Sequence, residues 1–166
     1  MDKYIFLDFD GVLNTSKYIH SNKERFSQIE DRTEWSIAKL DPSLIKNLNK
    51  ITDQTGAKIV ITSSWRINRT LDELITILRG AGVTGDIVGK TDKLHEPGYK
   101  IPRGSEIEKW LIDNGIKPHK FNSYVIIDDD TDMLYNQRNN FFNTDWEFGL
   151  GKNYAYRIIN FLNAVK

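Results

Sequence analysis

The sequence predicts an α/β fold in which helices cover both faces of a doubly wound, mostly parallel sheet. Short apolar runs that suit buried strands alternate with longer segments whose apolar residues recur at helical spacing, a pattern typical of parallel sheets. Two of the apolar runs end directly in clusters of aspartate. The length of 166 residues suits one domain, so we expect a single domain over residues 1–166 with an insertion or flap at about residues 14–40.

The expected strands are short. The clearest apolar runs are residues 4–7, 58–62 and 124–127, and weaker runs occur at residues 86–88 and 141–144. The segments between the core runs are long enough for helices, as a parallel sheet requires.

The expected helices carry recognisable start signals. Asp41 is placed to cap a helix that begins at the next residue. Thr70 and Glu73 have the spacing of a capping box, and Ser105 and Glu108 repeat it before a further helix. An amphipathic helix is expected at the end of the chain.

Composition excludes several classes of function. The chain has 23 basic and 23 acidic residues, so an attraction to nucleic acid must come from a local patch. It has no cysteine, which excludes disulfides, thiol catalysis and thiolate metal sites. No run approaches the roughly 20 apolar residues of a membrane span, and Asp8 and Asp10 interrupt the apolar N-terminal stretch. We therefore expect a cytoplasmic location.

The stretch "YIFLDFDGVLN" places two carboxylates at the end of a buried strand. Asp8 and Asp10 lie two residues apart and share one side of an extended chain, and Gly11 allows a sharp turn. Two neighbouring carboxylates repel each other unless a cation lies between them or one is protonated. Ligands of open α/β sheets bind beyond the carboxyl ends of the strands, so we expect a cation there.

A second acidic cluster follows the strand "YVII" and comprises Asp128, Asp129, Asp130 and Asp132. Two parallel strands that end in carboxylates would form an all-oxygen pocket, which suits Mg²⁺. Either cluster alone could instead be a helix cap or a solvated turn. An EF-hand is excluded, because Met133 stands where that loop needs glycine and Asn139 where it needs glutamate.

Candidate phosphate ligands lie between the two acidic clusters. The stretch "SSWR" places Ser63, Ser64 and Arg66 directly after the second strand. Further along, "YKIPRGSEI" places Lys100 and Arg103 just before a helix N-terminus, a favourable location for anions. Taken singly, these residues could equally be turn residues and solvated cations.

The order of these motifs resembles the haloacid dehalogenase (HAD) superfamily of phosphohydrolases. The stretch "FLDFDGVLN" matches the superfamily's first motif, and the resemblance extends over about residues 4–144. Within the superfamily, "IVITSSWR", "RGSEI", "VIIDDDTDM" and "FNTDWEFGL" resemble phosphatase domains of nucleic-acid end-repair proteins. These include the 3′-phosphatase part of polynucleotide kinase and a domain of multifunctional RNA-repair proteins. The resemblance implies a HAD-like Rossmannoid fold with a small cap or none.

The resemblance also implies a role for each candidate residue. Asp8 would be the nucleophile that forms an aspartyl-phosphate, and Asp10 would protonate the leaving oxygen and then activate water. Ser63 or Ser64 would bind the phosphoryl group. Arg103, or failing that Lys100, would fill the basic third motif, which is more often lysine.

The same resemblance implies a Mg²⁺ site. Its ligands would be Asp128, Asp129, Asp8 and the carbonyl of Asp10, with Asp132 as a possible replacement for one aspartate of the second cluster.

The expected partner is a phosphorylated substrate, with single-stranded nucleic acid ends favoured. We expect neither residues 14–39 nor residues 66–99 to form a full cap domain, and an open site suits a phosphate on the end of a polymer. The insertion interleaves cations with aromatics, which could grip phosphates and stack bases; these residues are Lys17, Tyr18, His20, Lys23, Arg25, Phe26, Arg32 and Trp35. An ordinary solvated flap is the alternative.

Other functions stay open on the residues alone. A small-molecule or nucleotide phosphomonoesterase would need the same site, as would phosphotransfer to an acceptor other than water. A receiver-type signalling module also uses an acidic strand-end pocket, but its phosphoacceptor aspartate would follow a strand in the middle of the chain, and neither run there, at residues 58–62 or 86–88, ends in aspartate. A nucleic-acid-binding relative without turnover is disfavoured by the intact DxDG.

Overall fold

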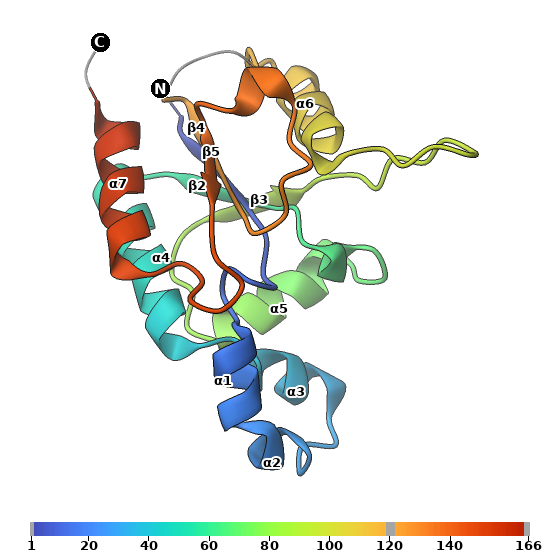
Figure 1. The fold of residues 1–166 in the computed structure, drawn as a ribbon, viewed down its shortest axis with the longest axis vertical. Helices are drawn as coiled ribbons and strands as arrows, with labels where there is room; N and C mark the ends of the chain where they lie inside the picture. The colour runs from blue at the N-terminus through green and yellow to red at the C-terminus, as the bar shows by residue number, and fades with distance from the viewer. Residues whose placement is uncertain (1, 119–121, 165–166) are drawn as a thin grey trace.

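The computed structural model describes residues 2–118 and 122–164, and its centre is a five-stranded sheet whose described strand pairs are all parallel (Figure 1). The strand order is β3-β2-β1-β4-β5. The strands are β1 (Tyr4–Leu7), β2 (Lys58–Ile61), β3 (Ile87–Lys90), β4 (Tyr124–Asp128) and β5 (Phe141–Asn143). The expected α/β fold is therefore confirmed.

Helices cover both faces of this sheet, and further short helices lie at one end of the molecule. The helices are α1 (Ser16–Ser21), α2 (Lys23–Phe26), α3 (Arg32–Ala38), α4 (Pro42–Thr55), α5 (Leu71–Gly80), α6 (Arg103–Asp113) and α7 (Lys152–Asn163). Short 3₁₀ turns occur at η1 (Ser64–Arg66) and η2 (Tyr135–Gln137). Helices α4, α5 and α7 contribute to the core cluster on one face, and α6 contributes to the cluster on the other.

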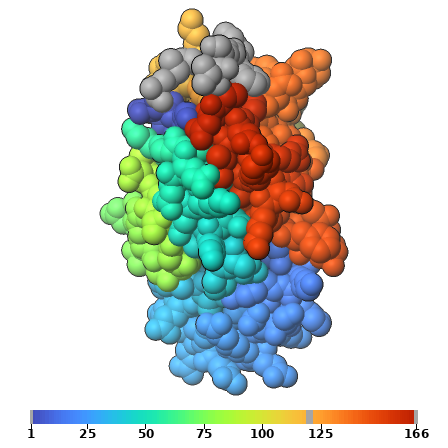
Figure 2. Space-filling model, turned by 90° about the vertical axis from the view of Figure 1, so that its left-hand side faces the viewer, coloured from blue at the N-terminus to red at the C-terminus, as the bar shows by residue number. Residues whose placement is uncertain are grey.

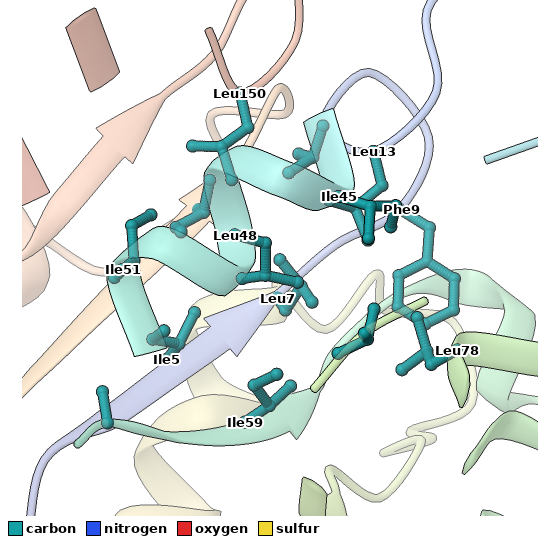
Figure 3. Close-up of a cluster of buried hydrophobic side chains, with 14 of the residues drawn as sticks. Ile5, Leu7, Phe9, Leu13, Ile45, Leu48, Ile51, Ile59, Leu78 and Leu150 are labelled. Atoms are coloured by element: carbon teal, nitrogen blue, oxygen red, sulfur yellow. The ribbon is translucent and has the colours of Figure 1, made fainter. Parts of the chain in front are cut away.

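The two clusters follow from the alternation of side chains along β1. Ile5 and Leu7 pack into the larger cluster with Leu48 of α4, as Figure 3 shows, while Phe6 packs into the smaller one with Leu111 of α6. All of these side chains are fully buried, and burying an aliphatic side chain of this size stabilises a fold by roughly 1.5–3 kcal/mol. Apolar contacts on both faces thus hold β1 and the residues that follow it.

Two of the expected helix starts are confirmed. The side chain of Asp41 accepts a hydrogen bond from the backbone N–H of Ser43 at 2.8 Å and caps α4. Thr70 and Glu73 form a reciprocal capping box at the start of α5.

The third expected start is wrong. Helix α6 begins at Arg103 rather than after a cap at Ser105, so Ser105 and Glu108 both lie inside it. The N-terminus of α6 is capped instead by Asp132, which lies far from it in the sequence. Its carboxylate accepts a hydrogen bond from the backbone N–H of Arg103 at 3.2 Å, and its carbonyl accepts one from Gly104 at 3.2 Å.

Helices α1, α2 and α3 occupy residues 16–38 and gather at one end of the molecule, beyond the carboxyl end of β1 (Figures 1 and 2). Figure 2 shows them as the blue end of the space-filling surface. This stretch is where the sequence predicts an insertion or flap. Among the described residues, no helix has the length and apolar character that crossing a membrane requires.

Candidate active site

Asp8 and Asp128 come together because β1 and β4 are neighbouring parallel strands. Leu7 pairs with Ile127, so the residues that follow them lie side by side, and the backbone N–H of Asp8 donates to the carbonyl of Ile127 at 3.0 Å. Strand order reverses at this pair, which is the position where open α/β sheets bind ligands. Both carboxylates are buried.

Asp129 reaches the same place because Gly11 leaves room for it. Gly11 has φ +67°, a left-handed conformation that other residues rarely adopt, and a Cβ built there would lie 2.2 Å from Oδ2 of Asp129. Oxygens of Asp8, Asp128 and Asp129 lie within 4.8 Å of one another. A side chain at position 11 would therefore disturb the turn and the acidic cluster together.

The cluster of Asp8, Asp128 and Asp129 fits a hard divalent cation. Within residues 2–118 and 122–164, Oδ1 of Asp8 and Oδ2 of Asp128 are buried without a hydrogen-bond partner, and each faces a guanidinium nitrogen of Arg103 in an ion pair. Such atoms are costly to bury unless they are compensated by charge. Mg²⁺ prefers carboxylate oxygens, so these three residues could hold it.

Arg103 supplies positive charge to the cluster. Its Nη1 lies 3.4 Å from Oδ1 of Asp8 and its Nε lies 3.2 Å from Oδ2 of Asp128. Nη1 also donates to the carbonyl of Thr62 at 2.7 Å, which fixes the guanidinium at the end of β2. Burial works against the charge of Arg103, but the surrounding carboxylates outweigh it and raise its pKa.

The carboxylates have raised pKa values because burial disfavours their charged forms. Burial, with the charge of Asp8 adding to it, raises the pKa of Asp128 to about 8. Burial also raises the pKa of Asp8, although Arg103 opposes the shift, and it raises the pKa of Asp129, where Asp130 adds to it.

These shifts predict that the metal-free protein loses stability as pH rises. Because the pKa of Asp128 is about 8 when folded and 3.8 otherwise, the folded state binds the proton more tightly. In EDTA, the free energy of unfolding should therefore fall by roughly 5 kcal/mol between about pH 4 and pH 8, as urea titrations would measure. Asp128→Asn should remove most of this fall, and the exposed control Asp53→Asn should keep it. An unchanged slope in Asp128→Asn would contradict the assignment.

Asp10 lies outside this cluster of three carboxylates, and two donors fix its side chain. Nδ2 of Asn14 donates to Oδ1 at 2.8 Å, and Nε1 of Trp65 donates to Oδ2 at 2.9 Å. The Trp65 ring packs edge-on against Phe9, with centroids 5.4 Å apart. Sequence reasoning missed both donors. The spacing of Asn14 four residues after Asp10, around a glycine turn, was a usable signal; Trp65 lies far away in sequence and gave none.

The two candidate serines have different surroundings. Ser63 is fully buried, and its hydroxyl opposes the rise in the pKa of Asp8. Ser64 is exposed and lines a cavity of about 120 Å³ together with Lys100 and Arg103. Lys100 is also exposed, so Arg103 is the basic candidate that contacts the carboxylates.

Arg66 is one of the expected phosphate ligands, but in the structure its guanidinium binds other groups of the protein. It forms a buried ion pair with Glu106, and it donates to the carbonyls of Ser63 at 2.9 Å and Thr91 at 3.0 Å. Arg66 thereby ties the turn after β2 to α6. Glu106, a buried carboxylate on that helix, was not found by sequence reasoning because acidic residues are common in the first turn of helices.

Asp132 also differs from its expected place. Its carboxylate caps α6, as described above, and it does not belong to the cluster of three aspartates found among the described residues. Its contribution is to position Arg103, whose backbone it holds.

A comparison with known families adds an independent finding. The family model described as "HAD domain in Swiss Army Knife RNA repair proteins" matches residues 4–155. No curated protein and no solved structure matches the chain.

Proposed function

Because the chain belongs to the family of HAD domains in Swiss Army Knife RNA repair proteins and is a HAD-type phosphatase, we propose that it removes a 3′-terminal phosphate from nucleic acid, with Mg²⁺ as its cofactor. The observation that supports this proposal most directly is that three carboxylates lie together while a fourth is held at a separate position. Asp8, Asp128 and Asp129 gather where a cation could lie, whereas Asn14 and Trp65 hold Asp10 apart from them.

In the proposed reaction, a carboxylate oxygen of Asp8 attacks the phosphorus while the bond to the leaving oxygen breaks. Asp10 gives its proton to that oxygen. Water then attacks the aspartyl-phosphate, Asp10 takes a proton from the water, and Asp8 is released with inorganic phosphate. Arg103 and the Ser63 hydroxyl would hold the phosphoryl oxygens.

HAD domains generally use Mg²⁺, and the residues here suit it. Asp8, Asp128 and Asp129 would hold the ion, with the carbonyl of Asp10 as a further candidate ligand. When bound, it would neutralise charge on the phosphoryl group.

Two observations support a polymer end as the substrate. The family description names RNA repair proteins. The segment beside the site at residues 16–38 consists of three short helices, which leaves less to enclose a small metabolite than a folded cap domain would.

A substrate panel tests the proposal. Phosphate release should be measured with Mg²⁺ from 4-nitrophenyl phosphate, nucleoside monophosphates, and RNA oligonucleotides phosphorylated at the 3′ or the 5′ end. We expect the 3′-phosphorylated oligonucleotide to have a kcat/KM at least about tenfold above the others and a steeper salt dependence, because polymer phosphates release counterions on binding. EDTA should abolish turnover and added Mg²⁺ should restore it.

Two outcomes would contradict parts of the proposal. Equal kcat/KM and equal salt dependence for the aryl phosphate and the oligonucleotides would leave a phosphatase without an end-repair role. Undiminished turnover after rigorous chelation would remove the Mg²⁺ assignment.

A further inference from the structure

A row of aromatic and cationic side chains leads from Asp10 to α3. Trp65, whose Nε1 donates to Asp10 at 2.9 Å, has the ammonium of Lys39 at 5.6 Å from its ring centroid. The same ammonium lies 4.4 Å from the ring centroid of Trp35. Lys39 thus bridges two indole rings, and the outer one, Trp35, is 37% exposed.

The row continues into a hollow between α1, α2 and α3, which we call the α1–α3 hollow. Its volume is about 270 Å³, and it is lined by Ile19, Lys23, Phe26, Ser27, Trp35 and Lys39. Ile19, the largely buried Phe26 and the more exposed Trp35 give it an apolar lining, and two lysines give it positive charge. None of these described lining residues is acidic. Such a surface complements a planar base attached to a phosphate.

We propose that the α1–α3 hollow binds the base of the nucleotide next to the terminal one, while Lys39 contacts the phosphodiester between them. The proposal rests on the function proposed above, since it places a strand whose terminal phosphate lies at Asp8. The continuity of the row from Asp10 to Trp35 supports a single strand running from the active site over α3. Double-stranded ends fit less well, because stacking in the hollow requires an unpaired base.

Lys23 and Arg25 are among the cations of the insertion that, on the sequence, could grip phosphates. Lys23 lines the hollow, and so does Lys39, which is not among the residues that the sequence singled out. Arg25 does not line the hollow.

The test measures what a second nucleotide contributes to catalysis. We compare kcat/KM for a mononucleoside 3′-phosphate with that for the dinucleotide carrying the same 3′-phosphate. In the wild type, the second nucleotide should raise kcat/KM about tenfold, within the range that one stacked base contributes. Trp35→Ala should reduce this gain to about twofold or less, and Trp35→Phe, which keeps an aromatic face, should retain most of it.

Lys39→Gln should lower the same gain and reduce the slope of log(kcat/KM) against log[salt] for longer RNA by about one, as the loss of one phosphate contact requires. Tyr156→Ala and Lys46→Gln are matched controls on α7 and α4, both at exposed positions, and should keep the wild-type gain. Thermal melts check that each variant is folded.

The outcomes separate this inference from the function on which it rests. If folded Trp35→Ala and Lys39→Gln keep the full gain in kcat/KM from the second nucleotide, the proposed binding of a base in the hollow is wrong. A preference of the wild type for 3′-phosphorylated RNA over aryl phosphate would still support the proposed function. No gain from a second nucleotide in the wild type also overturns the hollow. No preference for RNA over aryl phosphate overturns the proposed function and the hollow with it.

Discussion

Replacing Asp8 by asparagine is expected to reduce phosphate release by at least about a thousandfold, because an amide cannot act as the covalent nucleophile. The protein should remain folded. Burial raises the pKa of Asp8 because its charge is costly there, so a neutral side chain of the same shape removes that cost in the metal-free state. We therefore expect that, in EDTA at a pH above 7, the melting temperature of this variant equals or exceeds that of the wild type.

The matched control is Asp53→Asn. Asp53 is an exposed residue of α4, which packs on the face of the sheet opposite α6, and its replacement should leave both turnover and stability unchanged. Turnover of Asp8→Asn near that of the wild type would remove Asp8 from the proposed role. A loss of activity together with a loss of the folded state would instead indicate a structural role.

Replacing Arg103 by alanine is expected to have the second largest effect, with kcat/KM reduced by at least about a hundredfold. The guanidinium contacts Asp8, Asp128 and the Thr62 carbonyl together, so its loss would affect both the phosphate site and the charge balance of the carboxylates. At about pH 8 in EDTA, the free energy of unfolding should fall by on the order of 3 kcal/mol, because buried carboxylates would lose their partner. Urea titration and steady-state kinetics measure the two effects.

Two further variants make this prediction specific. Arg103→Lys should recover part of the activity, since it restores a charge, but not all of it, since an ammonium cannot make the three contacts of the planar guanidinium at once. Lys100→Ala should lower kcat/KM by no more than about threefold, because Lys100 is exposed and has no contact with Asp8 in the described structure. A larger loss in Lys100→Ala than in Arg103→Ala would exchange the roles of these residues.

The local features of the fold could be read from the sequence because they depend on neighbouring residues. The continuous apolar run at residues 4–7 identified a buried strand, and the capping box at Thr70 and Glu73 identified a helix start. The start of α6 could not be read in the same way. Its cap comes from Asp132, whose closeness to Arg103 depends on how the chain after β4 packs against α6.

The candidate site shows the same division. Chain order indicated that Asp8 and Asp128 follow buried strands. The sequence could not show that β1 and β4 are neighbours in register, nor that Trp65 donates to Asp10. These contacts join residues far apart in the chain, and no local periodicity encodes them.

The sequence by itself therefore determined the fold class, the strands that end in carboxylates, and the chemical types available for a cation and a phosphate. Only the tertiary structure decided which of those groups meet. It brings Arg103 rather than Lys100 to the carboxylates, and it engages Arg66 with Glu106. The physical reason is that strand and helix patterns report which side of an element is buried, whereas the pairing of charges depends on strand order, register and packing between elements.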